Sequence, residues 1–283
     1  MTFDQRQRQL DYETREAAGE SLLSETIDTR VRVRIQMLLD LLGQSVADID
    51  SYSSRDAIGT DVCKWLAFRS GHLVPGGRQH AWSSTLKYIL ECPTEILLSV
   101  LDLFAEFVPH GLAEGFEETL NDIFRQERIA YEMIGLEIVP IRDEHMHAEV
   151  VAPTLRLLSG RPGWDEVERA FRGALEQMAI DPANAITDAG TALQQALIAV
   201  GMKGNTIGLL AKDAAKNGVL APHDTTLNEA IGQIMHWVSA DRSTSGDGHN
   251  AKPASPADAW LIIHIVGALI LRLADGTNRD QSR

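Results

Sequence analysis

A polar, glycine-rich stretch separates two helical segments near the end of the chain: Asp241-Arg242-Ser243-Thr244-Ser245-Gly246-Asp247-Gly248-His249-Asn250. After it, Ser255-Pro256-Ala257-Asp258 is typical of a helix start, with Ser255 as the cap. That helix is predicted to run to about Asp275, where Gly276 would end it. Before the stretch, apolar residues recur at the spacing of a helix with one buried face; they are Leu227, Ala230, Ile231, Ile234, Met235 and Val238.

The two charged side chains of this loop suit the cleavage of RNA. The Arg242 guanidinium is permanently charged and has the planar fork that grips a phosphate. The His249 imidazole titrates near neutral pH and can take or give a proton. Together they could activate a ribose 2′-hydroxyl and stabilise the charged intermediate without a metal. The same spacing also occurs by chance, and an arginine at a helix end commonly neutralises the carbonyl groups there.

The loop between its two helices resembles the Arg-x(4–6)-His motif of HEPN domains. It is most similar to the version at the C-terminus of bacterial abortive-infection (Abi) proteins, in which Arg-Asn-x-x-Gly-Asp-x-His is common. This resemblance covers about residues 181–275, and residues 96–172 resemble the N-terminal part of the AbiJ-like subgroup. It implies a helical domain that pairs with itself, so that two motifs share one cleft.

The resemblance also implies an activity and a set of site residues. The activity is a metal-independent endoribonuclease acting in anti-phage defence or in a toxin–antitoxin system. Arg242 and His249 match the motif directly, and Asp247 fits its loop and is placed to orient His249 or to cap a helix. Ser243 stands where Asn, Asp or His is usual; its hydroxyl can hydrogen-bond but is not an acid or base at neutral pH.

Two other functions remain open from the sequence. In the first, Arg242 and His249 bind a nucleotide or nucleic acid without cleaving it, and the C-terminal bundle dimerises the protein. In the second, the N-terminal part is a sensor and the C-terminal bundle serves only to dimerise the protein. Residues 1–180 contain no Walker, GxGxxG, GxSxG or His-Glu-x-x-His motif, and no cofactor is predicted.

The charge is unevenly distributed along the chain. The net charge is −14, but residues 182–283 hold 8 Lys and Arg against 9 Asp and Glu, a net of −1. The remaining 18 against 31 give −13, so the acidity lies almost wholly in the N-terminal part. A paired Arg242 cleft could still attract RNA, while the acidic part would suit an antitoxin or sensor partner.

Cysteine usage and hydropathy predict a cytoplasmic protein without a membrane anchor. Cys63 and Cys92 form no CxxC pair or disulfide framework, and no signal peptide is evident. The most apolar run, Trp260 to Leu273, is predicted to be a buried helix. Apolar residues surround it on nearly all sides, so the N-terminal domain or a second copy of the chain is expected to cover it. Within it, His264 is expected to be a hydrogen-bonded core residue.

The fold class predicted is mainly α, with a helical N-terminal domain over 1–180 and a HEPN-like four-helix bundle over 181–283. A small β-hairpin is predicted near 129–141, and one continuous helix over Glu144–Leu158. His145 and His147 have a spacing that a metal could use on a strand, but no third ligand is evident and no metal site is predicted.

A run of alternating arginines marks the first strongly apolar helix, which is predicted from Thr29 to Gly43. Arg30, Arg32 and Arg34 have two interpretations. They are either a phosphate-binding patch or the solvated face of a helix, paired with surrounding acids.

Overall fold

The computed structural model of the chain describes residues 2–18, 22–49, 55–77, 80–217, 219, 226, 229–236, 238 and 254–280. The protein is mainly α-helical with one small antiparallel hairpin, which confirms the predicted fold class at that level. Its internal contacts divide it into two units, Met1–Arg142 (unit 1) and Asp143–Arg283 (unit 2).

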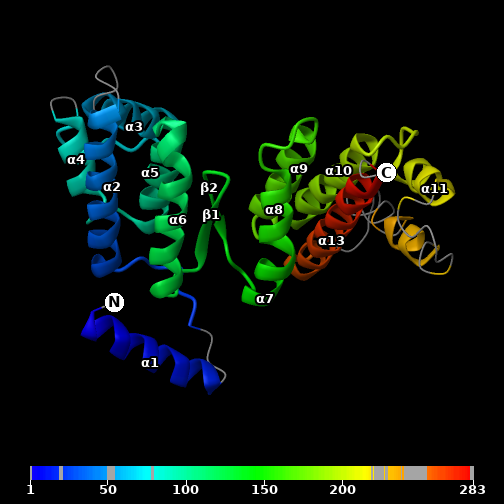
Figure 1. Cartoon of the computed structure of the whole chain (residues 1–283), viewed down its shortest axis with the longest axis horizontal. Coiled ribbons are helices and arrows are strands. Elements are labelled where there is room, and N and C mark those ends of the chain that lie inside the picture. The colour runs from blue at the N-terminus through cyan, green and yellow to red at the C-terminus, as the bar shows by residue number, and fades with distance from the viewer. Residues whose placement is uncertain are drawn as a thin grey trace. The chain divides into compact units, whose positions relative to one another are not determined.

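Unit 1 is a set of helices around one apolar core, with the hairpin at its end. Its helices are α1 (Phe3–Ala17), α2 (Thr29–Ile49), α3 (Arg55–Ser70), α4 (Ala81–Tyr88), α5 (Thr94–Phe107) and α6 (His110–Gln126) (Figure 1). Each of α2, α3, α5 and α6 turns an apolar stripe inward at helical spacing, as the sequence predicts. The largest fully buried side chains of this core are Phe104, Phe116, Phe124, Ile35, Leu39, Leu66, Ile89, Leu97, Leu101, Leu120 and Met133.

Helix α2 does not end at Gly43, and the prediction of its end is wrong. The helix continues to Ile49. Gly43 instead makes room for a neighbour, because a Cβ at this position would overlap the indole ring of Trp82. Trp82 is 3% exposed and packs edge-on against Phe104, with ring centroids 5.4 Å apart. The glycine therefore serves a contact between helices and not a helix end.

Because α3 packs closely against α4, replacing Gly59 by alanine should affect stability differently from replacing Gly115. A Cβ at Gly59 would lie 2.6 Å from the backbone nitrogen of Trp82 and 2.8 Å from its Cα, whereas one at Gly115 meets nothing within 4 Å. We expect Gly59→Ala to destabilise the protein by about 1–3 kcal/mol, because backbone atoms must move. Gly115→Ala, also inside a helix, should stabilise it by up to about 1 kcal/mol. Thermal unfolding followed by circular dichroism measures both, and equal shifts would refute the packing argument.

The hairpin pairs β1 (Tyr131–Ile134) with β2 (Glu137–Pro140) antiparallel, which confirms the predicted hairpin. Its two turn residues, Gly135 and Leu136, have φ of 61° and 67°, as tight two-residue hairpin turns require. The Glu117 carboxylate supports the turn by accepting a hydrogen bond from the Leu136 amide at 3.0 Å.

Side chains from two helices fasten the hairpin to unit 1. Asn121 of α6 accepts from the Met133 amide and donates to its carbonyl, both at 2.7 Å. Asp102 of α5 accepts from the Ile138 amide at 2.8 Å. An isolated hairpin of this size is only marginally stable in water. These hydrogen bonds, together with the burial of Met133 and Val139, therefore stabilise it.

Unit 2 begins before the predicted domain boundary at residue 180. Its elements are α7 (Glu144–Met146), a π-helical turn η1 (His147–Val151), α8 (Ala152–Leu158), α9 (Asp165–Gln177), α10 (Pro182–Ala199), α11 (Ile207–Lys216) and α13 (Pro256–Asp280). Contacts place residues 143–180 with the C-terminal helices, since α9 packs on α10 and α8 packs on α13. Small buried residues of α10, such as Ala185, Ala189 and Ala192, let its neighbours approach closely.

The helix predicted over Glu144–Leu158 is interrupted by η1. Pro153 explains the interruption, because proline has no amide proton and its ring clashes with the carbonyl four residues earlier. The wider π turn relieves that clash just before the proline.

Helix α13 runs through Gly276 to Asp280, so its predicted end near Asp275 is wrong. Its apolar side chains are mostly buried within unit 2 by η1, α8, α9 and α10. Gly267 permits this, since a Cβ there would lie 2.8 Å from Val150 and 3.2 Å from Phe171. Leu261 remains 44% exposed. The apolar composition of α13 therefore does not by itself require a second copy of the chain.

Candidate functional site

The four residues predicted to be catalytic, Arg242, Ser243, Asp247 and His249, lie outside the described residues. Their roles remain predictions. What the structure does describe is the two elements that flank them, both of which belong to unit 2.

The segment before the motif is helical over residues 229–236. Met235 and Val238 are fully buried, so the described part of this segment belongs to the core of unit 2. Gly208 of α11 lies against the imidazole of His236, because a Cβ there would lie 3.1 Å from Cε1. Helix α11 is thus a neighbour of the segment that leads into the motif.

The segment after the motif begins α13 with the predicted cap. The Ser255 hydroxyl accepts from the Asp258 amide at 3.2 Å, and the Asp258 carboxylate accepts from the Ser255 amide at 2.9 Å. This reciprocal pair fixes where the helix starts. Residues 241–250 therefore belong to the connection between two segments that are both anchored in unit 2.

His264 is a hydrogen-bonded core residue, as predicted. It is 7% exposed, and its Nδ1 donates to the Trp260 carbonyl at 2.6 Å. Its ring also lies on that of Trp260, with centroids 4.4 Å apart. Burial lowers the pKa of His264 below its ordinary value of 6.5, with a smaller contribution in the same direction from His147; the Trp260 bond and Asp143 oppose this shift.

The lowered pKa of His264 predicts a loss of stability in acid. The unfolded chain binds the proton more tightly than the folded one, so the stability contributed by neutral His264 is complete above pH 6.5 and is lost as the pH falls below it. We expect His264→Gln to flatten the dependence of unfolding free energy on pH between about 6.5 and 5. His145→Gln, at an exposed histidine of the same unit, is the control. Unchanged slopes in both variants would contradict the assignment.

By length and hydropathy, Pro256–Ala274 could cross a membrane. However, 56% of its most apolar window is buried inside the protein, as in the core helix of a soluble protein.

The two histidines around the start of η1 differ in environment. His145 is exposed and His147 is buried. Among the residues that the structure describes, no group of three or more His, Cys, Asp or Glu side chains could hold a metal ion.

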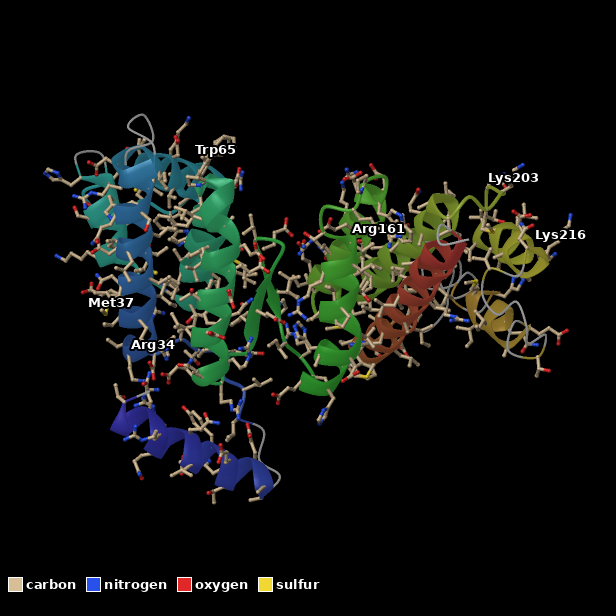
Figure 2. The ribbon with its side chains drawn as sticks, in the orientation of Figure 1. Arg34, Met37, Trp65, Arg161, Lys203 and Lys216 are labelled. Carbon is tan, nitrogen blue, oxygen red and sulfur yellow. The ribbon has the colours of Figure 1, made fainter. Side chains whose placement is uncertain are left out.

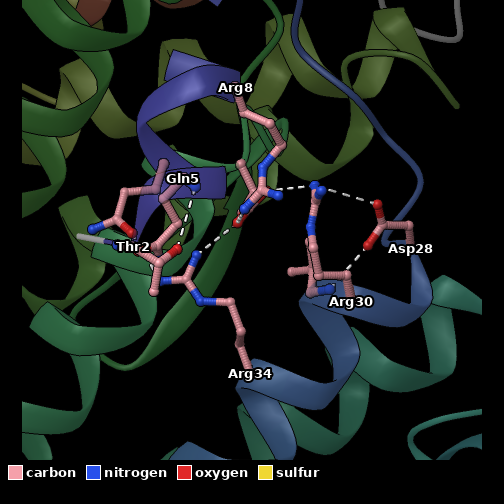
Figure 3. A network of polar contacts seen from close by, with 9 residues as sticks. Thr2, Gln5, Arg8, Asp28, Arg30 and Arg34 are labelled. Carbon is pink, nitrogen blue, oxygen red and sulfur yellow. Dashed lines mark hydrogen bonds and ion pairs between the residues drawn. The ribbon is translucent and has the colours of Figure 1, made fainter. Parts of the chain in front are cut away.

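A cluster that sequence reasoning missed surrounds Glu127, whose side chain is 2% exposed. Arg30 and Arg34 donate to its two oxygens at 2.6 and 2.8 Å, and Arg8 lies 3.6 Å away (Figure 3). The pairing expected for Arg30 and Arg34 is confirmed, but the partner is 97 and 93 positions away along the chain, so no local pattern could identify it.

Arg32 was expected on the same face, and for this residue the expectation is wrong. It is 7% exposed and donates to the carbonyl oxygens of Ile27 and Ile89, each at 2.8 Å. Those carbonyls belong to the entry to α2 and the end of α4. Arg32 therefore joins chain segments inside unit 1.

A comparison with family models adds independent evidence. Residues 1–155 match the model of AbiJ N-terminal domain 4. This match starts well before the resemblance expected from residue 96 and covers unit 1 in full. No curated protein and no solved structure matches the chain. Because the matched segment is more than half of the 283 residues, the chain belongs to the abortive-infection family defined by AbiJ N-terminal domain 4.

Proposed function

We propose that the protein is a metal-independent endoribonuclease that acts in the cytoplasm, in abortive infection or in a toxin–antitoxin system. The single observation that carries the proposal is the Arg242–His249 motif in a chain whose family is associated with abortive infection. His249 is the general acid or base, and Arg242 holds the scissile phosphate and stabilises its developing charge. Ser243 and Asp247 supply hydrogen bonds that orient these groups.

The described parts of unit 2 are consistent with this proposal. Buried Met235 and Val238 on one side and the Ser255 cap on the other hold the two ends of the connection. A cleft made by two copies of the chain, paired through the C-terminal bundle, would double the sparse set of catalytic groups. An antitoxin or sensor would then bind the acidic N-terminal domain.

Three exposed lysines support an RNA partner. Lys203, Lys212 and Lys216 lie on or beside α11, next to the segment that leads into the motif. Figure 2 shows Lys203 and Lys216 projecting away from the ribbon. Lysines placed in this way contact phosphates without reading the bases.

Incubation of the purified full chain with labelled RNA and EDTA tests the proposal. We expect cleavage to persist in EDTA and to leave a 2′,3′-cyclic phosphate and a 5′-hydroxyl, because the attacking group is the ribose hydroxyl. RNA that is retarded on a gel but stays intact would favour the alternative, a non-catalytic nucleotide- or nucleic-acid-binding module. Ser243, in place of a stronger polar group, is the feature that favours that alternative.

A further inference from the structure

The outward face of α2 carries a stripe of three large apolar side chains. Val33, Met37 and Leu41 follow one another at four-residue spacing and are 40%, 62% and 59% exposed. The residues of α2 that close the core of unit 1 lie on the opposite face; they are Val31, Ile35, Leu39, Leu42 and Val46. Single exposed apolar residues are common on soluble proteins, but the outward face of a helix is normally polar. A contiguous apolar stripe there marks a surface that contacts another molecule.

The neighbours of α2 in unit 1 leave this stripe uncovered. The helix packs against α3, α4 and α6, and the three side chains stay exposed in the presence of these contacts. Figure 2 shows Met37 on the outer side of the α2 ribbon. Side chains four residues apart form the ridge through which helices most often pack, because the ridge of one helix fits into the groove of another. The stripe is therefore suited to contact with a second helix.

The polar side chains beside the stripe indicate which helix this is. Arg34 lies three residues before Met37 and Asp40 lies three residues after it, so opposite charges flank the centre of the stripe. The Arg34 side chain is 25% exposed, and although its Nη1 donates to Glu127 at 2.8 Å, a guanidinium has five N–H donors. The Asp40 carboxylate accepts from the Gln44 amide at 3.2 Å, and it makes no ion pair with the residues that the structure describes.

We propose that α2 is a contact between two copies of this chain, paired antiparallel about a two-fold axis that passes through Met37. In this register Val33 lies against the partner's Leu41, and Arg34 lies beside the partner's Asp40. Apolar groups then meet apolar groups, and each positive charge meets a negative one. A parallel pair would instead bring the two copies of Arg34 together, and likewise those of Asp40, which is unfavourable. The contact lies in unit 1 and is separate from pairing through the C-terminal bundle.

The size of the stripe sets the strength expected of this contact. A standard stable interface buries about 800 Å² on each partner, and a single ridge of three side chains offers less than that. We therefore expect a weak association that depends on protein concentration, as in transient complexes.

Disulfide formation between copies of the full-length protein tests the proposal. Two cysteines can be bridged only when their Cα atoms lie within about 7 Å. Met37→Cys lies on the two-fold axis, so its oxidation should give a linked dimer on a non-reducing gel. In Val33→Cys or Leu41→Cys alone, the two equivalent residues are offset by about 12 Å along the helix and should link poorly. An equal mixture of these two variants should link, because each residue then faces the other.

The background of this experiment comes from two proteins. One is the wild-type chain, in which Cys63 is partly buried and Cys92 is buried. The other is Glu114→Cys, at an exposed position of α6. Linking of Met37→Cys no faster than in these two proteins would overturn the proposal. Linking of Val33→Cys to itself as readily as in the mixture would also overturn it, since the register would then be wrong.

Sedimentation equilibrium provides a second measurement. Met37→Asp places a charge within the apolar contact, so at the same high protein concentration its average mass should fall to about half that of the wild type. This holds whether or not the C-terminal bundles also pair. Phe68→Asp, which changes an 80% exposed apolar side chain of α3, is the matched control and should keep the wild-type mass. A wild-type mass in the Met37→Asp protein would show that copies of the chain do not meet through α2.

Discussion

The His249→Ala variant is expected to cleave RNA about 10²- to 10⁴-fold more slowly than the wild-type chain, because it loses the only imidazole of the motif. Arg242→Ala should lose a similar factor, since one preorganised cation at the scissile phosphate contributes about 10²- to 10³-fold. The two losses should not multiply in the double variant if the pair acts as a unit.

Initial rates with a labelled RNA, measured in EDTA, give these factors. His145→Ala is the matched control, because it removes an exposed histidine of the same unit outside the motif. Hydrogen exchange of the α10 and α13 amides verifies that each variant is folded. Cleavage at the wild-type rate in both the Arg242→Ala and the His249→Ala proteins would end the ribonuclease proposal.

The Glu127→Gln variant should lose about 3 kcal/mol of stability in unit 1, near the lower end of the cost of breaking a buried ion pair. The substitution keeps the side chain's size but removes a buried carboxylate that contacts all three arginines, Arg8, Arg30 and Arg34. We expect a loss near this lower limit because the partly exposed arginine side chains can reorient so that water solvates their guanidinium groups.

The loss is measured by hydrogen exchange of the α2 and α6 amides, which separates unit 1 from unit 2. Glu114→Gln changes an exposed carboxylate of α6, the helix that Glu127 follows directly, and should stay within about 0.5 kcal/mol of the wild type. A Glu127→Gln protein as stable as the Glu114→Gln protein would show that the arginines need no acid beneath them.

Most helices follow from local patterns, whereas their ends and interruptions depend on distant partners. The apolar spacing in α5 and α6 and the Ser255–Asp258 cap of α13 are complete within a few residues, so the sequence predicts them. Gly43 has the local signature of a helix end, but the indole of Trp82, from another helix, decides its role. Tertiary packing overrides propensity there.

The candidate site shows the same division between local and distant information. A motif such as Arg242 to His249 is local and can be identified by resemblance, although its geometry lies outside the described residues. Glu127 has no such signature, because charged residues are common and only the fold brings Arg8, Arg30 and Arg34 to this one. A cluster formed by ion pairs between residues far apart in the sequence can therefore be identified only from the three-dimensional structure.

The hydrogen bonds that hold the hairpin to α5 and α6 also affect how readily the protein can aggregate. Met133 and Ile138 face each other in the strand register; Asn121 bonds the amide and the carbonyl of Met133, and Asp102 bonds the amide of Ile138. An exposed edge strand has unpaired backbone N–H and C=O groups, and a strand of another polypeptide can pair with them and start aggregation. Here Asn121 occupies part of the outer edge of β1 and Asp102 part of the outer edge of β2, so the hairpin offers fewer free backbone groups to an incoming strand.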